Sequence, residues 1–145
     1  MTPGSPPAFL EELDDDTCRE LFGGVDVGRI AFRHGTSLEI FPITVTLHEG
    51  DPHFLTAPGT KLGTAASDSE VLVETDGYDA DEQTGWSVIA RGRAHLVIDH
   101  DELEPLMALN FEPWVELGQR GQWVRVEVEE WTGRRLRRDD DKDGP

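Results

Sequence analysis

The sequence has little lysine and few basic residues of any kind, and this shortage excludes several kinds of partner. Only two lysines, Lys61 and Lys142, occur among 145 residues. The 30 acidic side chains outnumber the 13 Lys and Arg, which leaves a formal net charge of −17. Nucleic acids and anionic membranes attract basic patches, so neither is expected as a partner. An anionic ligand must therefore be bound locally, by a few placed cations and backbone N–H groups.

Other absences narrow the class of protein further. The single cysteine, Cys18, excludes an intrachain disulfide framework and fits a reducing compartment, so we expect a cytoplasmic protein in which this residue belongs to the core. No apolar run approaches the ~20 residues that a membrane-spanning helix needs. The five histidines show no metal-binding spacing, so no metal site is expected. Residues 1–8 are rich in proline, glycine and serine, which predicts a disordered N-terminus without a secretory signal.

The apolar pattern predicts strands that follow one another at hairpin spacing. These strands are expected over residues 25–32, 38–47, 53–56, 70–76, 85–98 and 123–128. Short helices are expected from Asp14–Asp16 to about Leu21, over 60–66, and from Asp99 or Asp101 to about Asn110, with a polar loop over 77–83. This order indicates a mostly β, antiparallel barrel rather than a doubly wound α/β fold. We expect residues 9–136 to form one domain and 137–145 to form a charged, flexible tail.

The turn after the third expected strand has the composition of a phosphate site. Thr56, Gly59, Thr60 and Lys61 supply hydroxyl groups, a flexible backbone position and a cation within six residues. The turn does not match the G-x-x-x-x-G-K-[ST] pattern of a P-loop. An ordinary strand–turn–helix junction with a surface lysine explains the same residues and, taken alone, is the commoner structure.

Two further stretches have side chains suited to a planar or anionic ligand. Trp86, Ser87 and Val88 open a long expected strand, in which Trp86 could lie against a ring and Ser87 could hydrogen-bond it. The alternative is a tryptophan of the barrel core. Trp123 and Arg125 fall on one face of the last expected strand, where one could stack on a ring and the other reach an anion. The alternative is an apolar strand end with an ion-paired arginine.

The order of these motifs resembles the pyridoxamine 5′-phosphate oxidase-like family of flavin-binding split barrels. The resemblance covers about residues 10–136 and is carried by residues 27–31, 41–44, 54–62, 73–79, 84–88, 91–94 and 132–136. It implies a six-stranded antiparallel split β-barrel that forms a homodimer, with FMN bound between the protomers. It also implies that Thr56, Thr60 and Lys61 hold the FMN phosphate, and that Trp86, Ser87 and Val88 lie beside the isoalloxazine. Trp123 and Arg125 would reach the cofactor from the partner subunit.

What the resemblance implies about function is an FMN-binding, flavin-dependent oxidoreductase whose substrate and catalytic residues the sequence does not identify. Three alternatives stay open. The first is a reductase that uses the deazaflavin F420. The second is a non-catalytic module that carries flavin or haem. The third is an interaction domain that has kept the barrel and lost the cofactor.

The sequence departs from the family pattern at two places. Pyridoxamine-phosphate oxidases carry an Arg-Leu-His-Asp-Arg-like segment near the C-terminus that grips the substrate, whereas residues 132–138 contain no histidine. The basic partner of the FMN phosphate on the second strand is also missing, because residues 41–46 contain no Arg or Lys. These departures argue against pyridoxamine-phosphate oxidase activity itself. They also imply that Lys61 carries more of the phosphate charge than usual, or that the ligand differs from FMN.

Overall fold

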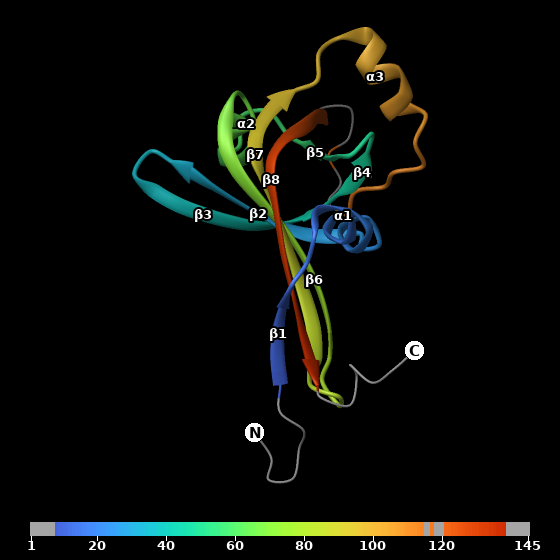
Figure 1. Cartoon of the computed structure of the whole chain (residues 1–145). Coiled ribbons are helices and arrows are strands. Elements are labelled where there is room, and N and C mark those ends of the chain that lie inside the picture. The colour runs from blue at the N-terminus through green and yellow to red at the C-terminus, as the bar shows by residue number, and fades with distance from the viewer. Residues whose placement is uncertain (1–7, 115–116, 118–120, 139–145) are drawn as a thin grey trace.

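One antiparallel sheet curls around an apolar interior and forms most of the molecule (Figure 1). The structure is a computed structural model and describes residues 8–114, 117 and 121–138. Its elements are β1 (Ala8–Glu12), α1 (Asp15–Gly23), β2 (Val27–His34), β3 (Ser37–Thr44), β4 (Thr46–His48), β5 (Asp51–Thr56), α2 (Lys61–Ala65), β6 (Ser69–Asp79), β7 (Thr84–Leu96), α3 (His100–Met107) and β8 (Gln122–Arg138). The strand order is β3-β2-β6-β7-β8-β5-β4, with β1 paired to β8. The predicted mostly β, antiparallel architecture is confirmed.

The described sheet has eight strands, two more than the resemblance implied. The predicted strand over 38–47 is divided at Val45, where the chain leaves the edge of β2, and Thr46–His48 then pairs with β5 as β4. Pro42 lies in β3, which is an edge strand, where a residue without an N–H group is tolerated. The second addition is β1, which the sequence did not indicate and which pairs with the last residues of β8.

Helix α1 closes one side of the barrel and confirms the prediction from its capping residues. The N–H of Thr17 donates to Asp14 Oδ1 at 2.8 Å, and the helix ends at Gly23 with Gly24 as its C-cap. Its buried side chains, Cys18 and Phe22, face the core of the barrel. Burial raises the pKa of the Cys18 thiol, which suits a core residue rather than a nucleophile.

Strands β6, β7, β8 and β1 extend beyond the barrel as a stalk, made of residues 8–12, 75–79, 84–88 and 133–138 (Figure 1). The polar loop predicted over 77–83 is shorter than expected, because β6 continues to Asp79, which pairs with Thr84. Strand β8 likewise continues past residue 136 to Arg138, opposite Ala8. The predictions for residues 1–7 and 139–145 lie outside the described residues.

Helix α3 covers a second, smaller apolar cluster at the end of the barrel opposite the stalk (Figure 1). Asp99 caps it, as predicted, and the buried residues of the cluster are Val97, Leu106 and Trp123. The helix ends at Met107 rather than near Asn110, and the N–H of Leu109 donates to the carbonyl of Leu106 in a tighter 3₁₀-type turn. Within the described part of the chain, no helix has the length and apolar character needed to cross a membrane.

Candidate functional site

A cavity of about 430 Å³ opens where the ends of β3 and β5 approach α2. Most of its wall is apolar, which suits the face of a ring rather than a charged ligand. Its described lining residues are Val27, Phe41, Pro42, Ile43, Thr44, Leu55, Thr56, Ala57, Thr60, Lys61, Leu62, Pro113, Trp114 and Leu117. Three residues of the predicted phosphate turn, Thr56, Thr60 and Lys61, are therefore brought together at one cavity.

The turn is held in shape by its own hydrogen bonds. The hydroxyl of Thr60 donates to the carbonyl of Ala57 at 2.8 Å and accepts from the N–H of Gly63 at 2.9 Å, so Thr60 is the N-cap of α2. Gly59 has φ of +83°, a backbone conformation that glycine adopts without strain. Because the hydroxyl of Thr60 already donates and accepts a hydrogen bond within the turn, it is less available to bind a ligand than the sequence suggested. Thr56 is 3% exposed and lies at the base of the turn.

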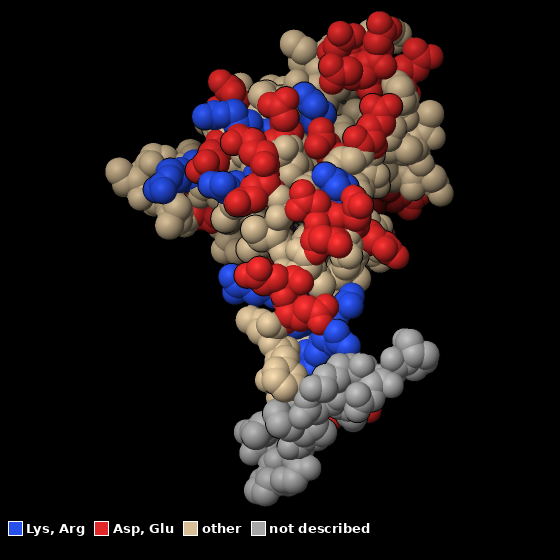
Figure 2. All heavy atoms as spheres, in the orientation of Figure 1, with Lys and Arg blue, Asp and Glu red and all other residues tan. Residues whose placement is uncertain are grey.

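Lys61 is held by an acidic side chain from the neighbouring strand β3. Its Nζ donates to Glu39 Oε1 at 2.6 Å, and the side chains are 55% and 22% exposed, respectively. Acidic side chains are numerous on the face drawn in Figure 2, with a group of them over α3. Lys61 is the one lysine among the described residues, so an anion that enters the cavity meets a cation already paired with Glu39.

The predicted ring-contacting residues Trp86, Ser87 and Val88 lie in the stalk or at its junction with the barrel. Along β8, the residue opposite Thr56 is Gln122 and the residue opposite Trp86 is Arg135. Thirteen residues separate them, which corresponds to a path of about 40 Å at ~3.3 Å per residue. Val88 is fully buried in the barrel core. The structure therefore does not bring these residues to the cavity of their own chain.

Trp123 and Arg125 share one face of β8, as the alternation predicted, and this face lies outside the barrel. Val124, between them, belongs to the core. Trp123 is 8% exposed and packs on Phe111, with ring centroids 5.1 Å apart. Neither Trp123 nor Arg125 lines the cavity.

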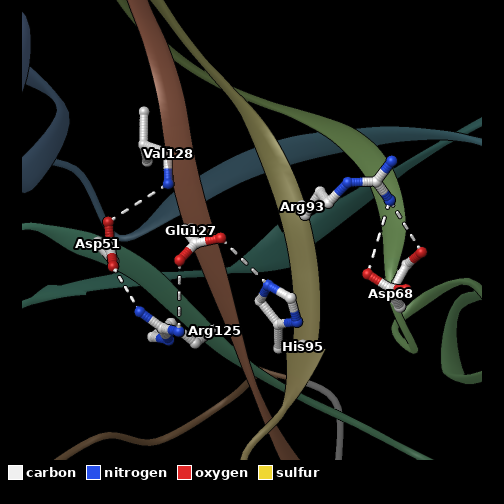
Figure 3. A network of polar contacts seen from close by, with 7 residues as sticks. All are labelled: Asp51, Asp68, Arg93, His95, Arg125, Glu127 and Val128. Atoms are coloured by element: carbon white, nitrogen blue, oxygen red, sulfur yellow. Dashed lines mark hydrogen bonds and ion pairs between the residues drawn. The ribbon is translucent and has the colours of Figure 1, made fainter.

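Arg125 belongs to a network of polar contacts on this outer face (Figure 3). Its guanidinium lies 3.2 Å from Asp51 Oδ2 and 4.0 Å from Glu127 Oε2. Glu127 also lies 3.5 Å from His95 Nε2, and the backbone N–H of Val128 donates to Asp51 Oδ1 at 3.5 Å. Arg125 thus links β5 to β8 within one chain, which is the role of the ion-paired arginine considered above.

One side of the cavity comes from a segment to which the sequence assigned no function. The backbone N–H of Trp114 donates to Thr44 Oγ1 at 2.9 Å, which fixes this residue beside the end of β3. Trp114 and Pro113 both line the cavity. The only local signal was an isolated tryptophan after a proline, and nothing in the sequence pairs it with a strand seventy residues earlier.

A second group of charged side chains lies on the outer surface of β2 and β6. Arg29 Nη1 donates to Asp76 Oδ2 at 2.9 Å and to Glu74 Oε1 at 3.4 Å. Partial burial raises the pKa of Glu74 to about 7, and the neighbouring Asp76 adds to the rise while Arg29 opposes it. This carboxyl is therefore half protonated near neutral pH, although it does not line the cavity.

The Glu74 carboxyl should make the stability of the protein depend on pH. The ordinary pKa of a glutamate, 4.5, applies to Glu74 in the unfolded chain, whereas the pKa in the folded chain is about 7. At a pH between these two values, the folded chain keeps a proton that the unfolded chain has lost, so the free energy of unfolding falls as pH rises. We expect Glu74→Gln to remove this fall, so that the variant gains stability relative to wild type between pH 4.5 and pH 8. Urea unfolding at both pH values measures the difference. Glu70→Gln, an exposed change on the same strand, is the control; equal effects of the two changes would contradict the expectation.

Among the residues that the structure describes, no group of three His, Cys, Asp or Glu side chains is placed to hold a metal ion. The cavity itself is lined by no Asp, Glu, His, Cys or Tyr in the described set. The cavity therefore combines an apolar wall with one paired cation and a few hydroxyl groups.

Comparison with known proteins gives matches over nearly the whole chain. The sequence profile of the family described as pyridoxamine 5′-phosphate oxidase matches residues 14–135. An uncharacterized protein from Mycobacterium tuberculosis is 32% identical over 147 residues, which cover 94% of this chain and 95% of that protein.

Among solved structures, the FAD binding protein from Mycobacterium smegmatis is 37% identical, with a TM-score of 0.77 over 88% of this chain and 100% of that one. A conserved protein of unknown function from Corynebacterium diphtheriae is 32% identical, with a TM-score of 0.72 over 86% of this chain and 96% of that one. These likenesses confirm the predicted split-barrel fold.

Proposed function

The chain belongs to the pyridoxamine 5′-phosphate oxidase family, and we propose that its cavity binds a flavin nucleotide. The observation that carries this proposal is the cavity of about 430 Å³, which combines an apolar wall with Lys61 and Thr56 at one side. A flavin nucleotide has the matching two parts, a flat ring system with apolar faces and a phosphate. The similar protein from M. smegmatis is an FAD binding protein, which supports the same class of ligand.

The residues present fit such a ligand. Lys61 would hold the phosphate by a charge-assisted hydrogen bond, with the hydroxyl of Thr56 and backbone N–H groups of the Thr60–Lys61 turn beside it. The apolar residues of the wall, among them Phe41, Ile43 and Leu55, would exclude water from the ring. FMN satisfies these requirements with the fewest atoms, and FAD adds an adenylate that extends past the phosphate.

A bound flavin supplies hydride and electron transfer, so we propose a flavin-dependent oxidoreductase. The described cavity wall offers no carboxyl, imidazole, thiol or phenol to move a proton. The protein's part would then be to bind the cofactor, orient it and limit the access of water, and protons would come from solvent or substrate. The two departures from the family pattern, in residues 132–138 and 41–46, keep pyridoxamine-phosphate oxidase activity outside the proposal.

A homodimer would bring the stalk into the same site. Trp86 and Ser87 are in β7, and their partners on β8 lie too far along that strand from the phosphate turn for either residue to meet a flavin held by its own chain. In the stalk, Leu10 is 63% exposed and Tyr78 is 82% exposed. These side chains form an apolar surface that a second protomer could cover. We therefore propose that Trp86 of the partner subunit lies beside the cofactor, and the particle mass should be twice 16.2 kDa.

The test is binding by the purified full chain. The protein is incubated separately with FMN, FAD and F420, and binding is followed by quenching of cofactor fluorescence; sedimentation gives the mass. Binding of FMN or FAD with a shifted visible spectrum is the expected result. Binding of F420 alone would show that the ligand is a deazaflavin instead of a flavin. A Soret band would indicate that the ligand is haem. The absence of all binding would overturn the proposal.

Turnover separates an enzyme from a carrier. A bound flavin that is reduced by a nicotinamide or by F420H2 and then passes electrons to an acceptor supports the oxidoreductase. A bound flavin that neither donor reduces supports a non-catalytic carrier.

Removing the charge of Glu39 should strengthen flavin binding. The Glu39 carboxylate competes with a phosphate for the Nζ of Lys61, to which it is bound at 2.6 Å. We expect Glu39→Gln to raise the affinity for FMN by about three- to five-fold, which corresponds to roughly 1 kcal/mol for a partly exposed ion pair. Titration with riboflavin, which has no phosphate, should show no gain. Glu130→Gln removes an equal charge from a pair with Arg91, and an equal gain in that variant would show a general charge effect instead.

A further inference from the structure

Trp114 is a large aromatic side chain that the fold leaves uncovered at the cavity. It is 78% exposed and lines the cavity together with Pro113. Its backbone is held in place, because its N–H donates to Thr44 Oγ1 at 2.9 Å at the end of β3, a strand that also lines the cavity. The structure thus fixes the backbone of this residue while its ring remains open to solvent.

The other tryptophans of the chain have clear packing roles. Trp131 is 7% exposed and meets Phe22 edge to face, with ring centroids 5.3 Å apart. Trp123 is 8% exposed and packs on Phe111. Trp86 lies across Gly77, where an added Cβ would come within 2.8 Å of the indole nitrogen. Among the described aromatic rings, none stacks on Trp114. Ring packing among the described residues therefore does not explain a tryptophan at this position.

We propose that Trp114 is a positioning residue for the ligand, which stacks its indole on the flat ring of the bound molecule. This inference rests on the proposed function and assigns the ring-binding part of the site to this residue. An indole presents a broad polarizable face and gains most from a planar, electron-poor ring system. The tricyclic isoalloxazine of a flavin is such a ring, and the apolar wall that includes Phe41 and Leu55 would line the rest of its pocket.

Ring and phosphate contacts can be separated because flavins come with and without phosphate. A residue that contacts the ring contributes equally to riboflavin, FMN and FAD. A residue that contacts the phosphate, as proposed for Lys61, contributes only to FMN and FAD. The ratio of affinities across the three ligands therefore reports which part of the ligand a side chain touches.

The experiment measures dissociation constants of riboflavin, FMN and FAD for the full-length protein and three variants. Trp114→Ala should weaken all three ligands by about ten-fold or more, whereas Trp114→Phe, which keeps a flat ring, should retain most of the affinity. Met107→Ala is the matched control, because Met107 is 73% exposed on α3 and does not line the cavity. Sedimentation of each variant records its oligomeric state, and circular dichroism records its folding.

The outcomes separate this inference from the proposed function. If wild type binds no flavin, both the proposed function and this inference are overturned. If wild type binds flavin and Trp114→Ala binds it equally well, only the inference is overturned. A loss confined to FMN and FAD, or a loss that accompanies a change in oligomeric state, also overturns it, because Trp114 would then serve the phosphate or a subunit contact.

Discussion

Replacing Lys61 with alanine is expected to weaken FMN binding by about 10- to 100-fold and to leave riboflavin binding nearly unchanged. A charge-assisted hydrogen bond contributes about 1.5–3 kcal/mol, which corresponds to this range of affinity. The effect is large because Lys61 is the one lysine among the described residues and the expected basic partner on the preceding strand is absent. Fluorescence titration with the two ligands measures both affinities.

Two further variants make the result specific. Lys61→Arg keeps the charge and should restore much of the FMN affinity. Arg19→Ala removes an equal charge from α1, where Arg19 pairs with Asp16 away from the cavity, and should leave the affinity unchanged. Unaltered FMN binding in Lys61→Ala would show that the phosphate lies elsewhere, even if the cavity holds the ring.

Replacing Gly92 with alanine is expected to destabilise the protein by about 3 kcal/mol or more. Gly92 lies at the register shift between β7 and β8, where the two backbones approach closely. A Cβ at this position would come within 1.9 Å of the carbonyl oxygen of Glu127 and 2.9 Å of Val128 Cα. These are backbone atoms at the centre of the sheet, so they cannot move aside without breaking the pairing of two long strands.

Urea or thermal unfolding measures this loss. Gly24→Ala is the matched control, because Gly24 has φ of −88° and an added Cβ would meet nothing nearer than 3.6 Å. We expect that control to stay within about 0.5 kcal/mol of wild type. If Gly92→Ala proves as stable as Gly24→Ala, the backbones of β7 and β8 do not approach each other as closely at this position as the structure shows.

The features of the fold that could be predicted from sequence are those with local causes. Asp14 and Asp99 are hydrogen-bonding caps, and each begins a helix where expected. Gly92 is a glycine in the middle of a strand, a position typical of a bulge, and the register shifts there. The helical turn after Gly59 likewise follows from Thr60, whose hydroxyl caps it.

The stalk could not be predicted in this way because its residues lack the alternation of a half-buried strand. The segment from Asp76 to Asp79 is polar and contains a glycine, which is typical of a loop, yet it pairs with residues 84–87 in a continuous hairpin. Its regular pairing depends on β7 and on the distant β8, which no local pattern reports. The same applies to β1, whose partner is separated from it by more than 120 residues.

The candidate site could be predicted only in part, because some of its residues are close in sequence and others meet only through tertiary contacts. Thr56, Thr60 and Lys61 are close in sequence, so their shared location needed only a turn. Alternation placed Trp123 and Arg125 on one face of a strand, but it does not say whether that face lies inside or outside the barrel. Trp114 reaches the cavity through a contact with Thr44, and such a tertiary contact leaves no signal in either segment.

The pair between Glu39 and Lys61 has a consequence for how the cavity selects among anions. Any anion that reaches Lys61 must first displace a carboxylate held at 2.6 Å. Chloride, inorganic phosphate and simple phosphate esters lack a ring to bury against the apolar wall, so we expect them to compete poorly for the site. A molecule that also buries a flat ring against the apolar wall gains enough in addition to displace Glu39. We therefore expect the acidic neighbour to keep the common small anions of the cell out of the cavity and to favour ligands that carry both a ring and a phosphate.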